Sequence, residues 1–164
     1  MKIDHEELLA RNPALVSRAF WHLAHSHAGA ARGEPPILPV FFVSAAMLLH
    51  RATVTKIRAM QFDSGLLKAV PEEPVLLTGL QGRVETHADA ALKALQVAVA
   101  SGLLAREGGD GFPRFRAMGG SALPPAIRDL DAPVSHMLSA ARRLGTWFAT
   151  DGFDAVRRQL NIEF

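Results

Sequence analysis

The amino-acid sequence predicts a mostly α-helical chain that contains a winged helix-turn-helix-like module with a short β-hairpin. Apolar residues recur with a period near 3.6 along most of the chain, as in amphipathic helices. In the middle, two helical patterns precede two short extended runs that flank a glycine-rich turn. With 164 residues, 49% of them hydrophobic, the chain can bury one compact core. We therefore expect a single domain over residues 1–164, with a winged-helix-like core at about 53–118, N-terminal helices within 5–50 and C-terminal helices within 126–160.

The charge balance and the absence of cysteine narrow the possible classes of function. Lysine and arginine number 18 against 16 acidic residues, a formal charge of only +2, whereas strong polyanion binders usually carry more. Without cysteine there are no disulfides, no thiolate zinc sites and no cysteine catalysis. The opening "MKIDHEELLARN" is acidic and amphipathic, unlike a secretory signal. We expect a cytoplasmic protein.

The first quarter of the chain predicts two helices and a loop. A short turn of helix is expected over Asp4 to Ala10. Asn12 followed by Pro13 then indicates the start of a longer helix. Its apolar stripe consists of Leu15, Val16, Ala19, Phe20, Leu23 and Ala24. Glycine and proline in "HSHAGAARGEPP" predict a mobile surface loop after it.

The run "ILPVFFVSAAMLL" predicts a buried helix. Its thirteen residues make a helix of roughly 20 Å, too short for a bilayer core of about 30 Å, so no membrane partner is expected. Pro39 suits the first turn of this helix. His50 is expected at its C-terminal end, where the imidazole satisfies a free carbonyl or the helix dipole; a catalytic histidine at a pocket mouth is the alternative. Thr53 is expected to cap the following helix.

The middle of the chain predicts the winged module. A helix is expected from about Pro74 to Arg83, then a turn, then a second helix with Thr86 as its N-cap and Gly102 at its end. The second helix carries an apolar face of Ala88, Ala91, Leu92, Leu95, Ala98 and Val99. The extended runs Leu103 to Glu107 and Phe112 to Met118, around "GGDG", predict a hairpin.

A winged module raises the question of DNA binding, for which the second helix is poorly equipped. Between Thr86 and Ser101 the groups able to read base edges are Lys93 and Gln96. Possible phosphate contacts are Lys93 together with Arg106, Arg114 and Arg116 of the hairpin. A protein-facing module and a purely structural one remain the alternatives to weak DNA contact.

The C-terminal part is again helical. After a proline-rich connector, Val134, Met137, Leu138, Ala141, Leu144 and Phe148 form one apolar stripe, with Arg142 and Arg143 on the opposite face. Gly145 is expected to let another helix pack closely. A short last helix is expected with Asp151 near its start and Arg157 and Arg158 near its end.

Residues suited to catalysis are sparse. His22 and His25 are one helical turn apart, the spacing of two metal ligands, but no third ligand follows at a recognisable distance, so solvent-facing histidines are expected. The serines lack a nucleophile-elbow context, and the glutamate pairs are adjacent rather than facing. We expect no enzyme, no catalytic residue, no metal and no cofactor.

Three segments together resemble a known family. They are "RNPALVSRAFWH", "LPVFFVSAAMLLHRATVTKIR" and "AARRLGTWFATDGFDAVRRQLNI". In this order they are similar to the middle component of bacterial three-component ABC systems. The matching residues are Asn12, Pro13 and Ala14, then Leu38, Pro39, Leu49, His50 and Thr53, then Ala141, Leu144, Gly145, Trp147 and Phe148.

The resemblance implies a non-enzymatic adaptor that binds an ABC or SMC-like ATPase and a third component, in defence against phage or foreign DNA. Its signature residues would be structural or partner-binding. Trp21, Trp147 and Phe153 either extend a partner surface or complete the core. The oligomeric state stays open, with a homodimer possible. The alternative function is a DNA-binding transcriptional regulator that acts as a dimer through residues 86–118.

Overall fold

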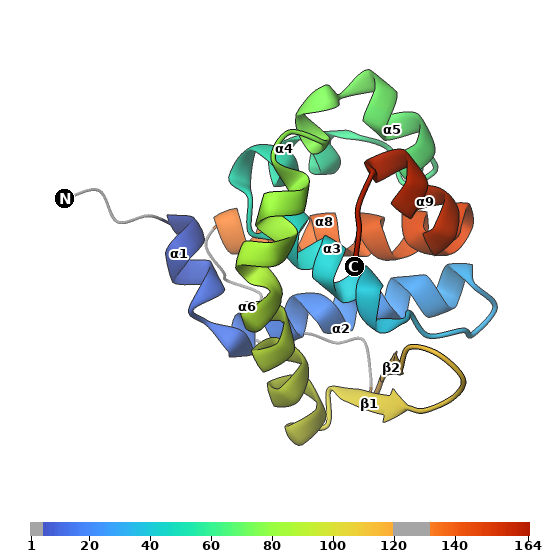
Figure 1. Ribbon diagram of the computed structural model, residues 1–164. Helices are drawn as coiled ribbons and strands as arrows, with labels where there is room; N and C mark the ends of the chain where they lie inside the picture. The colour runs from blue at the N-terminus through green and yellow to red at the C-terminus, as the bar shows by residue number, and fades with distance from the viewer. Residues whose placement is uncertain (1–4, 120–131) are drawn as a thin grey trace.

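The computed structural model describes residues 5–119 and 132–164, which are mostly helical with one two-stranded antiparallel sheet (Figure 1). The predicted connector at 120–131, which includes the expected helix start at 126, lies outside the described residues, as does Asp4. The elements in chain order are α1 His5–Ala10, α2 Pro13–Ala30, α3 Leu38–Leu48, α4 Arg51–Ala59, α5 Leu66–Glu72, the 3₁₀ turn η1 Pro74–Leu76, α6 Leu80–Ala100, β1 Leu104–Glu107, β2 Arg114–Ala117, α8 Ala132–Asp151 and α9 Phe153–Leu160.

Helices α2 and α8 form the most extensive helix pair of the fold. The predicted start of α2 is confirmed: Pro13 occupies its first turn, and the Asn12 side chain accepts a hydrogen bond from the Leu15 amide at 3.2 Å. The close approach expected at Gly145 of α8 is also present. A Cβ built on Gly145 would lie 2.2 Å from the carbonyl oxygen of Leu23 in α2. Only glycine fits at this crossing.

The buried helix expected in the second quarter is α3, and its prediction is confirmed. Pro39 lies in its first turn, and nearly every side chain from Pro39 to Leu49 is buried. Within the described ranges no single helix is long and apolar enough to cross a membrane. Helices α3 and α4 meet that criterion only as a pair, and they are bent by 101° where they join.

The helix-turn-helix boundaries predicted in the middle of the chain are wrong, and a winged helix-turn-helix module is not confirmed. One continuous helix, α6, contains the expected second helix and only the end of the expected first, from Leu80 to Arg83, while Pro74–Leu76 form the separate 3₁₀ turn η1. Its N-cap is Gly79 in the left-handed region (φ 68°), while Thr86 is inside the helix and donates to the Gly82 carbonyl at 2.8 Å. The helix continues because residues 83–87 contain no glycine or proline and Val84 is buried.

The hairpin prediction is confirmed. Strands β1 and β2 pair antiparallel, with Leu104 opposite Ala117 and Glu107 opposite Arg114. Gly102 (φ 78°) ends α6, and the Leu103 amide donates to the Ala98 carbonyl at 2.9 Å. The hairpin therefore starts directly from the C-terminus of α6, as Figure 1 shows.

Both tryptophans lie in the core, so the idea that they extend a partner surface is wrong. Trp21 and Trp147 are 1% and 0% exposed. Each indole N–H is satisfied by a backbone carbonyl: Trp21 donates to Met118 at 2.7 Å and Trp147 to Phe62 at 2.8 Å. Phe153 is half-buried against other aromatic rings.

The histidines of α2 are not all solvent-facing, contrary to expectation. His22 is 3% exposed and His27 is 8% exposed, because α2 is covered on several sides, by α6 and α8 above all. Burial, together with the positive charges of Arg142 and Arg18, lowers the pKa of His22 to about 4. His25 is exposed and stacks on the Trp21 ring.

Candidate partner-binding site

Of the four cations predicted from the sequence, Lys93 lies on α6 and the three arginines lie on the hairpin, where they occupy different faces. Arg106 is opposite Phe115 in the strand register, while Arg116 is opposite Ala105 and Arg114 is opposite Glu107. Because side chains alternate along a strand, Arg114 and Arg116 share one face and Arg106 lies on the other. The structure therefore separates residues that the sequence had grouped.

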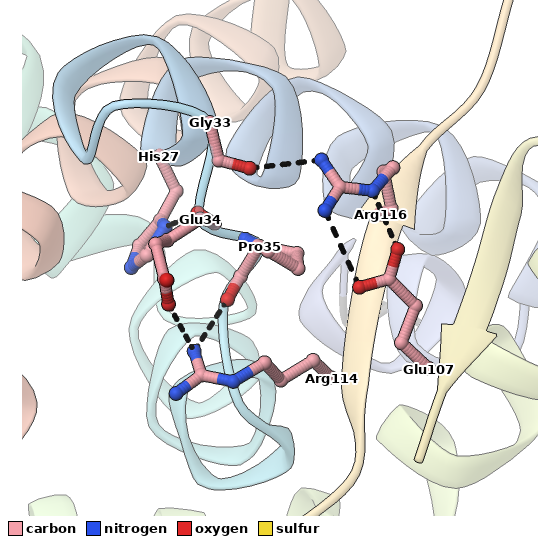
Figure 2. A network of polar contacts seen from close by, with 7 residues as sticks. All are labelled: His27, Gly33, Glu34, Pro35, Glu107, Arg114 and Arg116. Atoms are coloured by element: carbon pink, nitrogen blue, oxygen red, sulfur yellow. Dashed lines mark hydrogen bonds and ion pairs between the residues drawn. The ribbon is translucent and has the colours of Figure 1, made fainter. Parts of the chain in front are cut away.

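Arg116 is engaged within the protein on its face of the hairpin (Figure 2). Its Nε donates to Glu107 Oε1 at 2.6 Å and its Nη2 donates to Oε2 at 3.3 Å, a bidentate ion pair across the two strands. Its Nη1 also donates to the Gly33 carbonyl at 2.8 Å. The hydrogen bond from Arg116 lowers the pKa of the Glu107 carboxyl, and Glu107 raises the pKa of Arg116.

Arg114 anchors the same face to the segment between α2 and α3. Its Nη1 donates to the Pro35 carbonyl at 2.8 Å and lies 3.5 Å from the Glu34 carboxylate. His27 of α2 reaches the same segment, with Nδ1 2.9 Å from the Glu34 carbonyl oxygen (Figure 2). Burial lowers the pKa of His27, so the neutral imidazole is the form favoured at this contact.

Backbone hydrogen bonds complete this attachment. The Leu38 amide donates to the Pro113 carbonyl at 2.9 Å, and the Phe115 amide donates to the Pro36 carbonyl at 3.1 Å. The predicted loop over residues 25–36 is therefore wrong in its first half, which is helical, whereas residues 31–36 are a surface loop as expected. Helix α2 runs to Ala30, and residues 31–37 are held against β2 by side-chain and backbone bonds.

Lys93 and Arg106 differ from the other two cations. Both side chains are exposed, and within the described part of the chain neither side chain makes a hydrogen bond or an ion pair. Arg114 and Arg116 are already neutralised or hydrogen-bonded, so they are poorly placed to bind phosphates. Two uncommitted cations are a small electrostatic footprint for nucleic acid.

Arg106 lies at the edge of an apolar groove between α6 and the hairpin. The groove has a volume of about 510 Å³. Its lining consists of Leu38, Leu92, Leu95, Gln96, Val99, Ala100, Arg106, Pro113 and Phe115. Leu92 and Val99, which the sequence placed on the apolar face of the second helix, are 42% and 40% exposed here, and Phe112 beside Pro113 is 52% exposed. Exposed apolar side chains around a groove are typical of a protein-binding surface.

The signature residues His50 and Thr53 bond to each other. His50 Nδ1 is 2.6 Å from Thr53 Oγ1, across the first turn of α4. Thr53 is therefore not the N-cap as predicted, since His50 holds that position and Thr53 is three residues inside the helix and fully buried. The His50 backbone amide donates to the Met47 carbonyl at the end of α3 (3.3 Å). The pair joins α3 to α4.

The other signature residues also occupy structural positions. Asn12 and Pro13 start α2, and Pro39 starts α3. Leu144, Gly145, Trp147 and Phe148 of α8 are all buried. Among the described residues, no group of three or more histidine, cysteine, aspartate or glutamate side chains could hold a metal ion.

Comparison with family models gives a match over residues 1–164, the whole chain. The matching model describes the ABC-three component (ABC-3C) system Middle Component 3. The chain belongs to this family. The resemblance predicted from the three sequence segments is thereby confirmed. Comparison with curated proteins and with solved structures gave no match.

Two features of this middle component escaped sequence reasoning. The first is the attachment of the hairpin to residues 31–37, which depends on contacts between segments about 80 residues apart. The sequence did carry a signal for the ion pair. Arg114 and Arg116 are two residues apart on one expected strand, so they share a face, and Glu107 on the paired strand can lie on the same face. The second is the groove beside α6, for which the sequence carried no signal because Leu92 and Val99 fit the apolar helical period.

Proposed function

We propose that this middle component is a non-enzymatic adaptor subunit of an ABC-3C system that binds the ABC or SMC-like ATPase, the third component, or both. The family match over residues 1–164 carries the proposal. A middle component implies other components to bind. We further propose that the assembled system acts in defence against phage or foreign DNA.

The chemistry of the described residues supports a binding role. The signature residues are used in caps, helix junctions and helix contacts rather than in an open polar site. Two exposed apolar residues, Leu92 and Val99, line the groove between α6 and the hairpin, and exposed Phe112 is next in sequence to Pro113 of its lining. Such a groove suits protein contact, because apolar area removed from water is the main source of affinity in most protein association.

DNA-binding regulation is the weaker candidate. Arg114 and Arg116 are held by carboxylates and backbone carbonyls, and contact with phosphate would require these bonds to break. We expect any DNA binding by the chain alone to be sequence-blind and to disappear in moderate salt.

Co-purification tests the proposal. Tagged middle component is co-expressed with the ATPase component and with the third component, in both pairings and all together. We expect at least one pairing to survive washing at physiological salt. Failure of every combination, with all components soluble, would contradict the adaptor role.

A second assay tests the absence of catalysis. Purified middle component is incubated alone with ATP and, separately, with DNA, and we expect no hydrolysis of either. ATP hydrolysis that co-elutes with the chain through successive purification steps would overturn the non-enzymatic assignment.

A further inference from the structure

Helix α6 presents a row of exposed side chains away from the core. Asp89, Leu92, Gln96 and Val99 follow one another at intervals of three and four residues, so they lie along one side of the helix. All four are exposed. The row ends beside the hairpin, at the C-terminus of α6 (Figure 1).

The row contains both an apolar ridge and one wall of an apolar groove. Leu92 and Val99 are exposed on the ridge and also line the groove. When two copies of this surface meet, the ridge of each copy can therefore pack into the groove of the other. The groove's opposite wall comes from the hairpin through Arg106 and Phe115.

The charges of this face are opposite at its two ends. Asp89 lies at the middle of α6, and Arg106 lies in β1, at the hairpin end of the face. In the described ranges neither side chain makes a hydrogen bond or an ion pair. Lys93, one turn after Asp89, is not within ion-pair distance of it. By contrast, Arg116 on the other face of the hairpin has its own carboxylate.

We propose that the outer face of α6 and the adjoining groove bind a second copy of this chain, with the two α6 helices antiparallel. Antiparallel helices bring the Asp89 end of each copy against the Arg106 end of the other. The segment from Asp89 to Val99 spans about 15 Å at 1.5 Å per residue, so both ends take part in one contact. Leu92 and Val99 of each copy then cover the groove of the other.

The mixed charge favours a second copy over other occupants. Nucleic acid or a strongly acidic helix would be attracted by Arg106 and Lys93 but repelled by Asp89, which lies one turn from Lys93. A two-fold related copy satisfies both charges with one set of residues, because each contact occurs twice. This self-association goes beyond the adaptor role and is measured on the middle component alone.

Light scattering after size-exclusion chromatography tests the proposal over a series of protein concentrations. We expect the wild-type mass to rise with concentration toward that of two chains. A mass that stays at that of one chain throughout overturns the proposal. The same result is expected if the groove binds only another component of the system, or only DNA.

Charge exchange identifies the surface. Asp89→Arg places arginine opposite Arg106, and Arg106→Asp places aspartate opposite Asp89, so each variant alone should raise the dimer dissociation constant at least about tenfold. An equimolar mixture restores both opposite-charge contacts, because one chain then carries two arginines and the other two aspartates. We expect the mixture to regain the wild-type mass, as should the double variant that carries both changes.

Controls separate this effect from a general change in charge or fold. Asp63→Arg and Lys68→Asp change exposed charges in the segment before α5 and in α5, and they should leave the dimer unchanged. Circular dichroism confirms that every variant is folded. If the two single variants dissociate and their mixture does not reassociate, or if the control variants dissociate equally, the α6 contact is wrong.

Discussion

Gly145→Ala is the substitution that most directly tests the packing of α2 against α8. The added Cβ would lie 2.2 Å from the Leu23 carbonyl oxygen and 3.1 Å from the His27 backbone nitrogen. Ordinary contact with such atoms begins near 3.4 Å, so the helices would have to separate by roughly 1 Å. Both opposing atoms belong to the backbone of α2, where no side chain can rotate away.

The expected loss of stability follows from two opposing effects. Overpacking typically costs about 1–3 kcal/mol and occasionally more, and a clash with backbone atoms of α2, which cannot rotate away, belongs at the upper end. Alanine in a helix interior recovers at most about 1 kcal/mol relative to glycine. We therefore expect a net loss of about 2 kcal/mol, equivalent to a fall in Tm of about 4–8 °C for a chain of this size.

Gly82→Ala is the matched control in α6. Gly82 is exposed, its φ is negative, and a Cβ built there meets nothing within 4 Å. The same chemical change should raise stability by about 0.5–1 kcal/mol. Urea unfolding followed by circular dichroism measures both variants. If Gly145→Ala proves as stable as Gly82→Ala, the close crossing of α2 and α8 is refuted.

Three further predictions concern buried polar groups. Because the pKa of His22 is lowered to about 4, the unfolded chain binds its proton first as the pH falls, so stability should decrease between pH 6.5 and pH 4 by up to about 3 kcal/mol. Tm measured against pH should show a smaller decrease in His22→Phe than in wild type, and equal slopes would contradict the prediction. Thr53→Val keeps the size of this fully buried side chain but removes the hydroxyl bonded to His50, so it should cost about 1 kcal/mol in urea unfolding; an unchanged unfolding midpoint would show that the bond contributes nothing. Trp147→Phe leaves the Phe62 carbonyl unpaired and a small cavity, so we expect a loss of about 1–3 kcal/mol by the same assay, and an unchanged midpoint would be inconsistent with this packing.

Local signals in the sequence predicted the starts of α2 and α3 and the buried character of α3. Asn12 with Pro13, and Pro39 in an apolar run, act within one helical turn, so their effect does not depend on distant contacts. Gly145 was also interpretable, because a glycine inside an apolar helical stripe usually marks a close approach.

Features set by tertiary contacts were harder to predict. The turn was expected before Thr86 because threonine is a common N-cap residue, but no glycine or proline between residues 83 and 87 interrupts the helix there. The burial of Val84 in the core favours one continuous helix. His22 is buried because of what packs around α2, which its position in the sequence does not reveal. The hydrogen bonds that attach residues 31–37 to β2 likewise come from side chains distant in sequence, Arg114 and Arg116.

The candidate site was predicted in part. The sequence grouped Lys93 and Arg106 with Arg114 and Arg116 as equivalent cations, since each is basic and near the hairpin. Their difference lies in the alternation of side chains along the strands and in the position of Glu107, which engages Arg116. Pairing geometry therefore decides which cations remain available.

The measurement that tests the adaptor role most directly is the solution mass of the complex obtained when the three components of the system are co-expressed and purified through the middle component. We expect a stoichiometric complex whose mass includes the ABC ATPase or the third component together with this chain. The opposite result is a middle component that elutes by itself while the ATPase and the third component associate without it, and that result would contradict the adaptor role.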